Sequence, residues 1–109
     1  MAPAGLGLLG LGARSRTLVV GSGGVRAALQ QDGVALVVTA SDRSDRTREK
    51  VERLALAKGV PCVTGPAAAE LGRRIGRRTP IQAVGVRDRR LAAGIVGAIQ
   101  AKVEEERSD

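Results

Sequence analysis

Short apolar runs rich in β-branched residues alternate along this chain with longer stretches whose apolar residues recur at helical spacing. The strongest run is VALVVTA at 34–40, a continuous apolar segment typical of a buried central strand. Shorter runs at 17–20, 60–64 and 81–86 also predict strands. A chain that supplies several such strands must bury them between helices, because their side chains are apolar on both faces.

Helical patterns lie before, between and after the four runs. Helices are predicted over 4–13 and 22–31, from a Ser44 or Asp45 cap to Gly59, from Pro66 through Ile75, and from Asp88 onward. Their inner faces are expected to carry Val25, Ala28 and Leu29; Val51, Leu54 and Ala55; Ala68, Leu71 and Ile75; and Leu91, Ile95, Ile99 and Val103. The order α-β-α-β-α-β-α-β-α predicts an α/β protein with a layered α/β/α sandwich around a mostly buried sheet.

Length and composition set the size and chemistry of the core. The 109 residues suffice for one domain, with an ordered core expected over about 5–102 and a charged tail over 103–109. The chain has no Phe, Tyr or Trp, so Leu, Val, Ile and Ala must form the core. The same absence removes aromatic base stacking, the usual way to hold single-stranded nucleic acid.

Basic residues dominate the charge, which is formally +7. A compact domain with this excess favours phosphate-bearing partners, although a merely arginine-rich surface is the simpler alternative. The basic residues cluster near predicted element ends: Arg14 and Arg16; Arg26; Arg43, Arg46 and Arg48; and Arg73, Arg74, Arg77 and Arg78. Sequence alone does not show whether these clusters share one face.

The sequence lacks the residues that several classes of function require. With no His, a histidine general base, a serine triad and most zinc sites are excluded. The single cysteine, Cys62, is expected to be a small buried core residue of its strand. No apolar stretch reaches bilayer length, and the apolar start lacks the basic residues of a signal peptide. We therefore expect a cytoplasmic, non-enzymatic protein without cofactor or metal, and without a small-molecule substrate or a membrane as partner.

The segment VVGSGGVRAAL, at 19–29, places a glycine cluster between a strand and a helix. Such a turn can bind phosphate through backbone amides at the helix start. It lacks the Lys and the following Ser or Thr of a P-loop, so a nucleotide-binding enzyme is the weaker interpretation. A stretch of RNA backbone suits the turn and its neighbouring basic loops better.

Three motifs in order resemble the ribosomal L7Ae/L30e family, in particular its small bacterial members of the YlxQ type. LLGLGARSRTLVVG resembles the group's opening. ALVVTASDRSDRTREKVERLALAKGVPCV resembles its central strand, cap and helix, and AAELGRRIGRR its ELG helix and turn. The resemblance runs through about residue 101. It implies a three-layer α/β/α sandwich with a central four-stranded mixed sheet, and RNA binding without catalysis.

Many family members bind kink-turn RNA through G-x-N-E-x-x-K at the glycine turn. Here Gly21 matches, whereas Gly23, Gly24 and Ala27 stand where the Asn, Glu and Lys would be. The side chains that would read bases are missing, so contacts through the backbone are expected at this turn. Specificity would then come from RNA shape or from the loop at 77–81, the family's second RNA-contacting loop.

The resulting hypothesis is a protein that binds structured RNA, either kink-turn-like or ribosomal, with the ribosome as a candidate partner. The predicted contacts are Arg14, Arg16, Gly21, Ser22, Gly23, Gly24, Arg26, Arg43, Arg77, Arg78, Thr79, Pro80 and Ile81. The alternative is a ribosome-associated protein-interaction module that has kept the fold and lost kink-turn recognition.

Overall fold

The central layer is a four-stranded mixed sheet, as a computed structural model shows for residues 6–107. Its strands are β1 (Leu18–Val20), β2 (Leu36–Thr39), β3 (Cys62–Thr64) and β4 (Ala83–Val86), in the order β1-β4-β2-β3. β4 pairs antiparallel with both β1 and β2, and β2 pairs parallel with β3. The predicted sheet is confirmed, with the apolar run at 34–40 supplying an interior strand.

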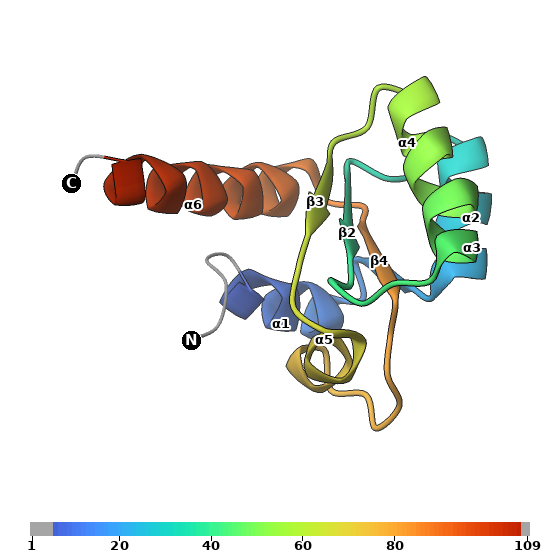
Figure 1. Ribbon diagram of the computed structural model, residues 1–109, viewed down its shortest axis with the longest axis horizontal. Coiled ribbons are helices and arrows are strands. Elements are labelled where there is room, and N and C mark those ends of the chain that lie inside the picture. The colour runs from blue at the N-terminus through green and yellow to red at the C-terminus, as the bar shows by residue number, and fades with distance from the viewer. Residues whose placement is uncertain (1–5, 108–109) are drawn as a thin grey trace.

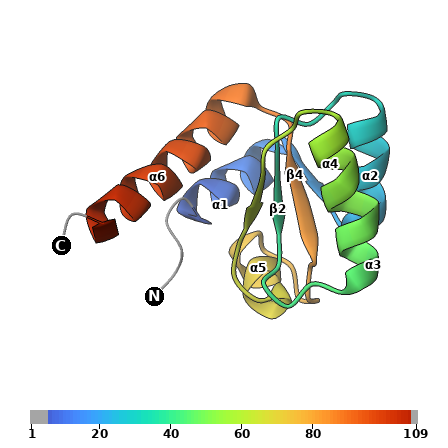
Figure 2. The same cartoon turned by 45° about the horizontal axis from the view of Figure 1, so that its top comes forward.

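Helices cover both faces of this sheet (Figure 1). They are α1 (Leu6–Ser15), α2 (Ser22–Gln30), α3 (Asp45–Thr47), the π-helical segment η1 (Arg48–Glu52), α4 (Arg53–Ala57), α5 (Ala68–Arg74) and α6 (Arg89–Arg107). α3, η1 and α4 follow one another without a break and form one long helix. It lies with α2 on one face, while α1, α5 and α6 lie on the other (Figure 2). The predicted three-layer sandwich is therefore confirmed.

The core has two parts because the interior strands are buried on both faces. On one side Leu36 and Val84 pack with Leu9, Leu71 and Ile95 from α1, α5 and α6. On the other side the buried strand residues Val37 and Ala83 pack with Val25, Ala28, Leu29, Val51 and Ala55. The apolar faces predicted for these helices are confirmed, except that the side chain of Val103 lies outside the described part of the structure. Aliphatic side chains form both clusters, and the buried polar residues are Thr39 and Thr47.

Helix ends follow the predicted caps. The Ser44 hydroxyl accepts a hydrogen bond from the Thr47 amide at 3.2 Å, and the carboxylate of Asp88 accepts one from Arg90 at 2.8 Å. α6 continues to Arg107, so most of the segment expected as a frayed tail is helical. The structure does not describe residues 1–5, where the predicted first helix was to begin, or the last two residues. Within 6–107 no helix is long and apolar enough to cross a membrane.

The expectation that Cys62 is buried is wrong. β3 lies at the edge of the sheet, and Cys62 is exposed there. The apolar sequence of this strand does not reveal its edge position, because strand order is set by the whole fold. Partial desolvation and the nearby Glu52 carboxylate raise the pKa of the Cys62 thiol above its usual value.

We expect Cys62 to react with a thiol reagent in the folded protein, one thiol per chain. The reaction at pH 7 should be slower than that of a peptide cysteine, because the raised pKa lowers the fraction of reactive thiolate. Absorbance with Ellman's reagent measures both the count and the rate, with the urea-unfolded chain as control. A thiol that reacts only after unfolding would contradict the exposed position.

Candidate nucleic-acid interface

One end of the sheet carries a hollow formed by three segments that are distant in sequence. We call it the turn hollow. It is lined by Gly21, Ser22 and Gly23 before and within α2; by Ser44, Arg46, Thr47 and Lys50 at the start of the long helix; and by Pro80, Ile81 and Gln82 before β4. The glycine turn and the loop that precedes β4, both predicted RNA contacts, thus lie on one surface.

Gly21 sets the shape of the glycine turn. Its φ of 94° lies in a region that side-chain-bearing residues rarely adopt. Its amide donates to the Ala83 carbonyl at 2.9 Å, which joins the turn to β4. Gly21 is also the N-cap of α2 and provides no side-chain cap. The first amides of α2 are therefore capped by no side chain, and with the helix dipole they favour an anion at this point.

Gly23 and Gly24 differ in the space around them. A Cβ built on Gly23 would meet nothing within 4 Å, whereas one on Gly24 would lie 3.1 Å from Val19 Cγ1. Both glycines are exposed. The backbone at Gly23 is thus open to a partner's close approach, while Gly24 also permits α2 to pack closely on β1.

The side chain of Gln82 fixes the opposite wall of the turn hollow. Its Oε1 accepts hydrogen bonds from the Ser44 amide at 2.9 Å and from the Thr47 hydroxyl at 2.8 Å. The Gln82 carbonyl in turn accepts a bond from the Ala40 amide at 2.8 Å. These bonds join the start of the long helix to the start of β4, so the two walls are held at a fixed separation.

The loop before β4 packs directly on α5. Gly72 makes this possible, because a Cβ there would lie only 2.3 Å from the Thr79 carbonyl oxygen. The Arg77 amide donates to the Gly72 carbonyl at 2.8 Å, and the Ile81 amide donates to Ala68 at 3.0 Å. The glycine of the ELG motif thus has a physical role, which is to let this loop lie against the helix.

Two cations line the turn hollow. Arg46 and Lys50 lie one helical turn apart, and neither forms an ion pair with another described residue. Arg46 belongs to a cluster that the sequence analysis noted, but Lys50 was missed. The i, i+4 spacing after the Ser44 cap was the available signal, because it places both side chains on one helix face.

The remaining predicted contacts do not all meet at the turn hollow. Arg16 and Arg77 line a separate hollow beside β1, together with Ala13, Leu18, Val20 and Ile75. The other predicted side chains line neither hollow: Arg14, Arg26, Arg43, Arg78 and Thr79. Of these five residues, all except Arg43 are exposed. The structure therefore brings only part of the predicted set together at the turn hollow.

Arg43 has a different environment from the one expected. Its Nε donates to the Glu52 carboxylate and its Nη1 donates to the Ala40 carbonyl at 3.2 Å. Glu52 also accepts a bond from the buried Thr39 hydroxyl. The Arg43 guanidinium is thus committed to holding the loop after β2 against the long helix.

Arg73 and Arg74 are also engaged, in their case by an acid on the same helix. Glu70 pairs with Arg73 at 2.5 Å and with Arg74 at 2.8 Å. Hydrogen bonding from Arg73 is the main reason that the pKa of Glu70 is lowered. Arg77 and Arg78 form no ion pair with a described residue, which leaves them as the available cations of the GRRIGRR segment.

The fold and this surface together define a class of protein, a small α/β/α sandwich with a basic hollow at a glycine turn. The family model of the ribosomal protein L7Ae/L30e/S12e/Gadd45 family matches residues 4–94, and the chain belongs to this family. A search of curated proteins gives no match.

Two solved structures illustrate the likeness. One is a protein of unknown function from Bacillus halodurans, with a TM-score of 0.83 and 31% identity over 88% of this chain and 96% of that chain. The other is the 15.5kD RNA binding protein of Giardia lamblia, with a TM-score of 0.74 and 25% identity over 88% of this chain and 84% of that one. Both comparisons span most of this chain, so the fold is shared over most of its length.

Replacing Gly72 by Ala should push the loop at 77–81 away from α5, because the new Cβ would overlap the Thr79 carbonyl. We expect a loss of about 1–3 kcal/mol in unfolding free energy, measured by urea denaturation. Amide NMR shifts should change over 77–81.

A matched control is Gly97→Ala, where a Cβ would meet nothing within 4 Å. This variant should instead gain up to about 1 kcal/mol from helix propensity. Equal stability of the two variants would show that the loop does not depend on close packing at Gly72.

Proposed function

We propose that this protein is a non-catalytic RNA-binding protein that holds structured RNA, kink-turn-like or ribosomal, in the turn hollow. The observation that carries the proposal is the convergence of the glycine turn, the cations Arg46 and Lys50, and the loop before β4 around one open surface. Family membership and likeness to an RNA binding protein from Giardia lamblia support it.

The chemistry of the turn hollow suits a phosphate backbone. The uncapped amides at the start of α2 would donate to phosphate oxygens, and Arg46 and Lys50 would neutralise neighbouring phosphates. Arg77 would extend the contact along the hollow beside β1. The chain has no aromatic ring on which a base can stack, so recognition would follow the shape of the RNA more than the identity of unpaired bases.

The preference for a kink-turn is the finer part of this proposal. The family's Asn, Glu and Lys are replaced here by Gly23, Gly24 and Ala27, so side-chain reading of sheared G·A pairs is lost. A sharply bent backbone would still fit between the glycine turn and the loop at 77–81. We place the protein in the cytoplasm, associated with ribosomal RNA, and assign it to the YlxQ-type branch as part of the same proposal.

Titration at physiological salt with a kink-turn RNA and a matched straight duplex tests the proposal. We expect tighter binding of the kinked RNA, because a bent backbone would contact the glycine turn and the loop before β4 together. Gly23→Asn should increase this preference, since the space around Gly23 admits a side chain that can reach the bases.

Each result of this titration has a definite meaning. Equal affinity for the two RNAs, with strong salt dependence, would mean that the protein binds RNA backbone in general and has no preference for a kink-turn. Binding to neither RNA would overturn the proposal and favour the protein-interaction alternative. An interaction that survives RNase treatment would then identify a protein partner.

Removing the cations of the turn hollow and of the GRRIGRR segment should weaken RNA binding and reduce its dependence on salt concentration. We expect Arg46→Gln/Lys50→Gln and Arg77→Gln/Arg78→Gln each to lower affinity roughly threefold to thirtyfold. Each pair should flatten the slope of log K against log salt by about 0.7–0.9 per lost phosphate contact. Fluorescence anisotropy over a salt series measures both quantities.

The control is Arg48→Gln/Arg53→Gln, which removes the same charge from exposed residues of the same helix that do not line the turn hollow. It should change the slope little. If the control and the test pairs behave alike, RNA attraction comes from net charge and the turn hollow is not the contact.

A further inference from the structure

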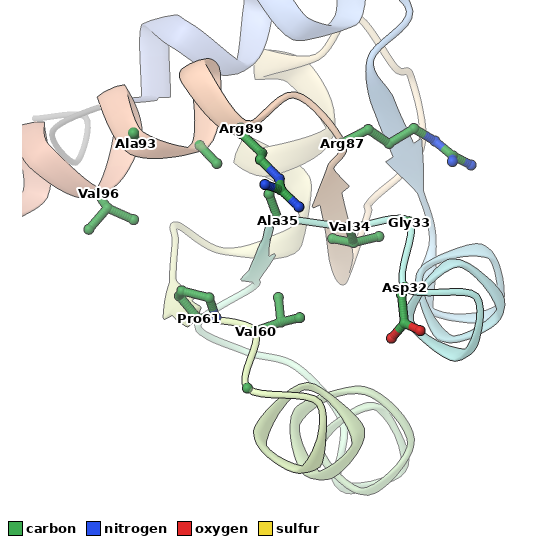
Figure 3. A pocket seen from close by; sticks show the side chains of 12 residues that line it. Asp32, Gly33, Val34, Ala35, Val60, Pro61, Arg87, Arg89, Ala93 and Val96 are labelled. Carbon is green, nitrogen blue, oxygen red and sulfur yellow. The ribbon is translucent and has the colours of Figure 1, made fainter.

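The opposite end of the sheet carries a second hollow, of about 610 Å³, between α6 and the segments that lead into β2 and β3 (Figure 3). We call it the α6 groove. β4 begins at Ala83, next to Gln82 of the turn hollow, and ends at Val86, next to Arg87 of the α6 groove. The two surfaces therefore lie at opposite ends of one strand, and a partner in one leaves the other free.

The floor of the α6 groove is apolar. Val34, Ala35, Val60 and Pro61 approach from the strand starts, while Ala92 and Val96 approach from α6. Ala35, Val60 and Val96 are only partly buried, so they retain apolar surface that a partner can cover. A ligand that inserts an aliphatic side chain gains from removing this surface from water.

Two free guanidinium groups flank the groove, Arg89 over it and Arg87 on its outer side, near Gly33. Arg87 and Arg89 are exposed and form no ion pair with another described residue. Figure 3 shows the Arg89 side chain reaching from the start of α6 over the groove toward Ala35. The rim's carboxylate, Asp32, is already paired with Lys58 at 3.1 Å. The groove thus presents uncompensated positive charge beside an apolar floor.

We propose that the α6 groove docks an acidic peptide segment of a partner protein, with an aliphatic side chain on the floor and carboxylates on Arg87 and Arg89. An RNA strand would use the arginines but not the apolar floor, and the chain offers no aromatic ring for its bases. A second copy of this chain carries the same +7 charge and is repelled. The proposal is independent of RNA binding at the turn hollow.

Selection of random dodecapeptides displayed on phage against the full chain tests this proposal. We expect the enriched peptides to combine Leu, Ile or Val with Asp or Glu. A synthetic enriched peptide, titrated into the ¹⁵N-labelled protein, should shift the amides of 33–35, 60 and 92–96. Replacing its acidic residues by the matching amides should weaken binding about tenfold, because two exposed ion pairs are lost.

Charge reversal in the protein supplies the decisive comparison. Arg87→Glu/Arg89→Glu should weaken the peptide about tenfold, while Arg48→Glu/Arg53→Glu, with the same change in net charge, should leave it nearly unchanged. Both pairs are exposed, so folding should be retained.

The peptide experiments overturn the proposal if acidic apolar peptides are not enriched, if the shifts map outside the groove, or if the two charge reversals have equal effects. A kink-turn RNA that shifts the groove amides would also overturn it, by making the groove an RNA contact. Loss of RNA binding at the turn hollow would leave the peptide result unchanged, so the two proposals fail separately.

Discussion

The insertion of β4 between β1 and β2 is the pairing on which the rest of the molecule depends. Val86 lies opposite both Leu18 and Leu36, and Val84 lies opposite both Val20 and Val38. This register aligns the end of β1 with the beginning of β4, so the glycine turn and the loop before β4 meet. The bond from the Gly21 amide to Ala83 continues the same ladder. The turn hollow is thus a direct consequence of strand order.

Much of this fold is predictable from the sequence because the spacing of apolar residues indicates which side chains are buried. The continuous apolar run around Val37 indicates a strand covered on both faces, and Val25, Ala28 and Leu29 indicate one helix face. Strand order leaves no such local signal, which is why Cys62 was wrongly expected in the interior. The π-helical turn at 48–52 also leaves no local pattern, because its residues are ordinary helix formers.

The backbone segments that form the candidate site could be predicted from the sequence. The roles of its charged side chains were harder to predict. Gly21 and the loop before β4 carry recognisable turn residues, and the structure brings them together. A charged side chain, by contrast, takes its role from partners that are distant in sequence. Arg43, in the loop after β2, is committed to Glu52, whereas Lys50, in the long helix, remains available in the turn hollow. From the sequence alone, Arg43 and Lys50 cannot be distinguished as a structural and an available cation.

The absence of aromatic residues has different consequences at the two ends of β4. In the proposed function it would limit recognition at the turn hollow to backbone amides and point charges, which respond to the path of phosphates in space. At the α6 groove the small aliphatic side chains leave a floor that rings would otherwise fill, and Arg87 and Arg89 stand free beside it. With the proposed RNA contact at one end, the chain would gain specificity from the proposed protein partner at the other. The separation of the two surfaces by a fully buried strand would let both partners bind without competing.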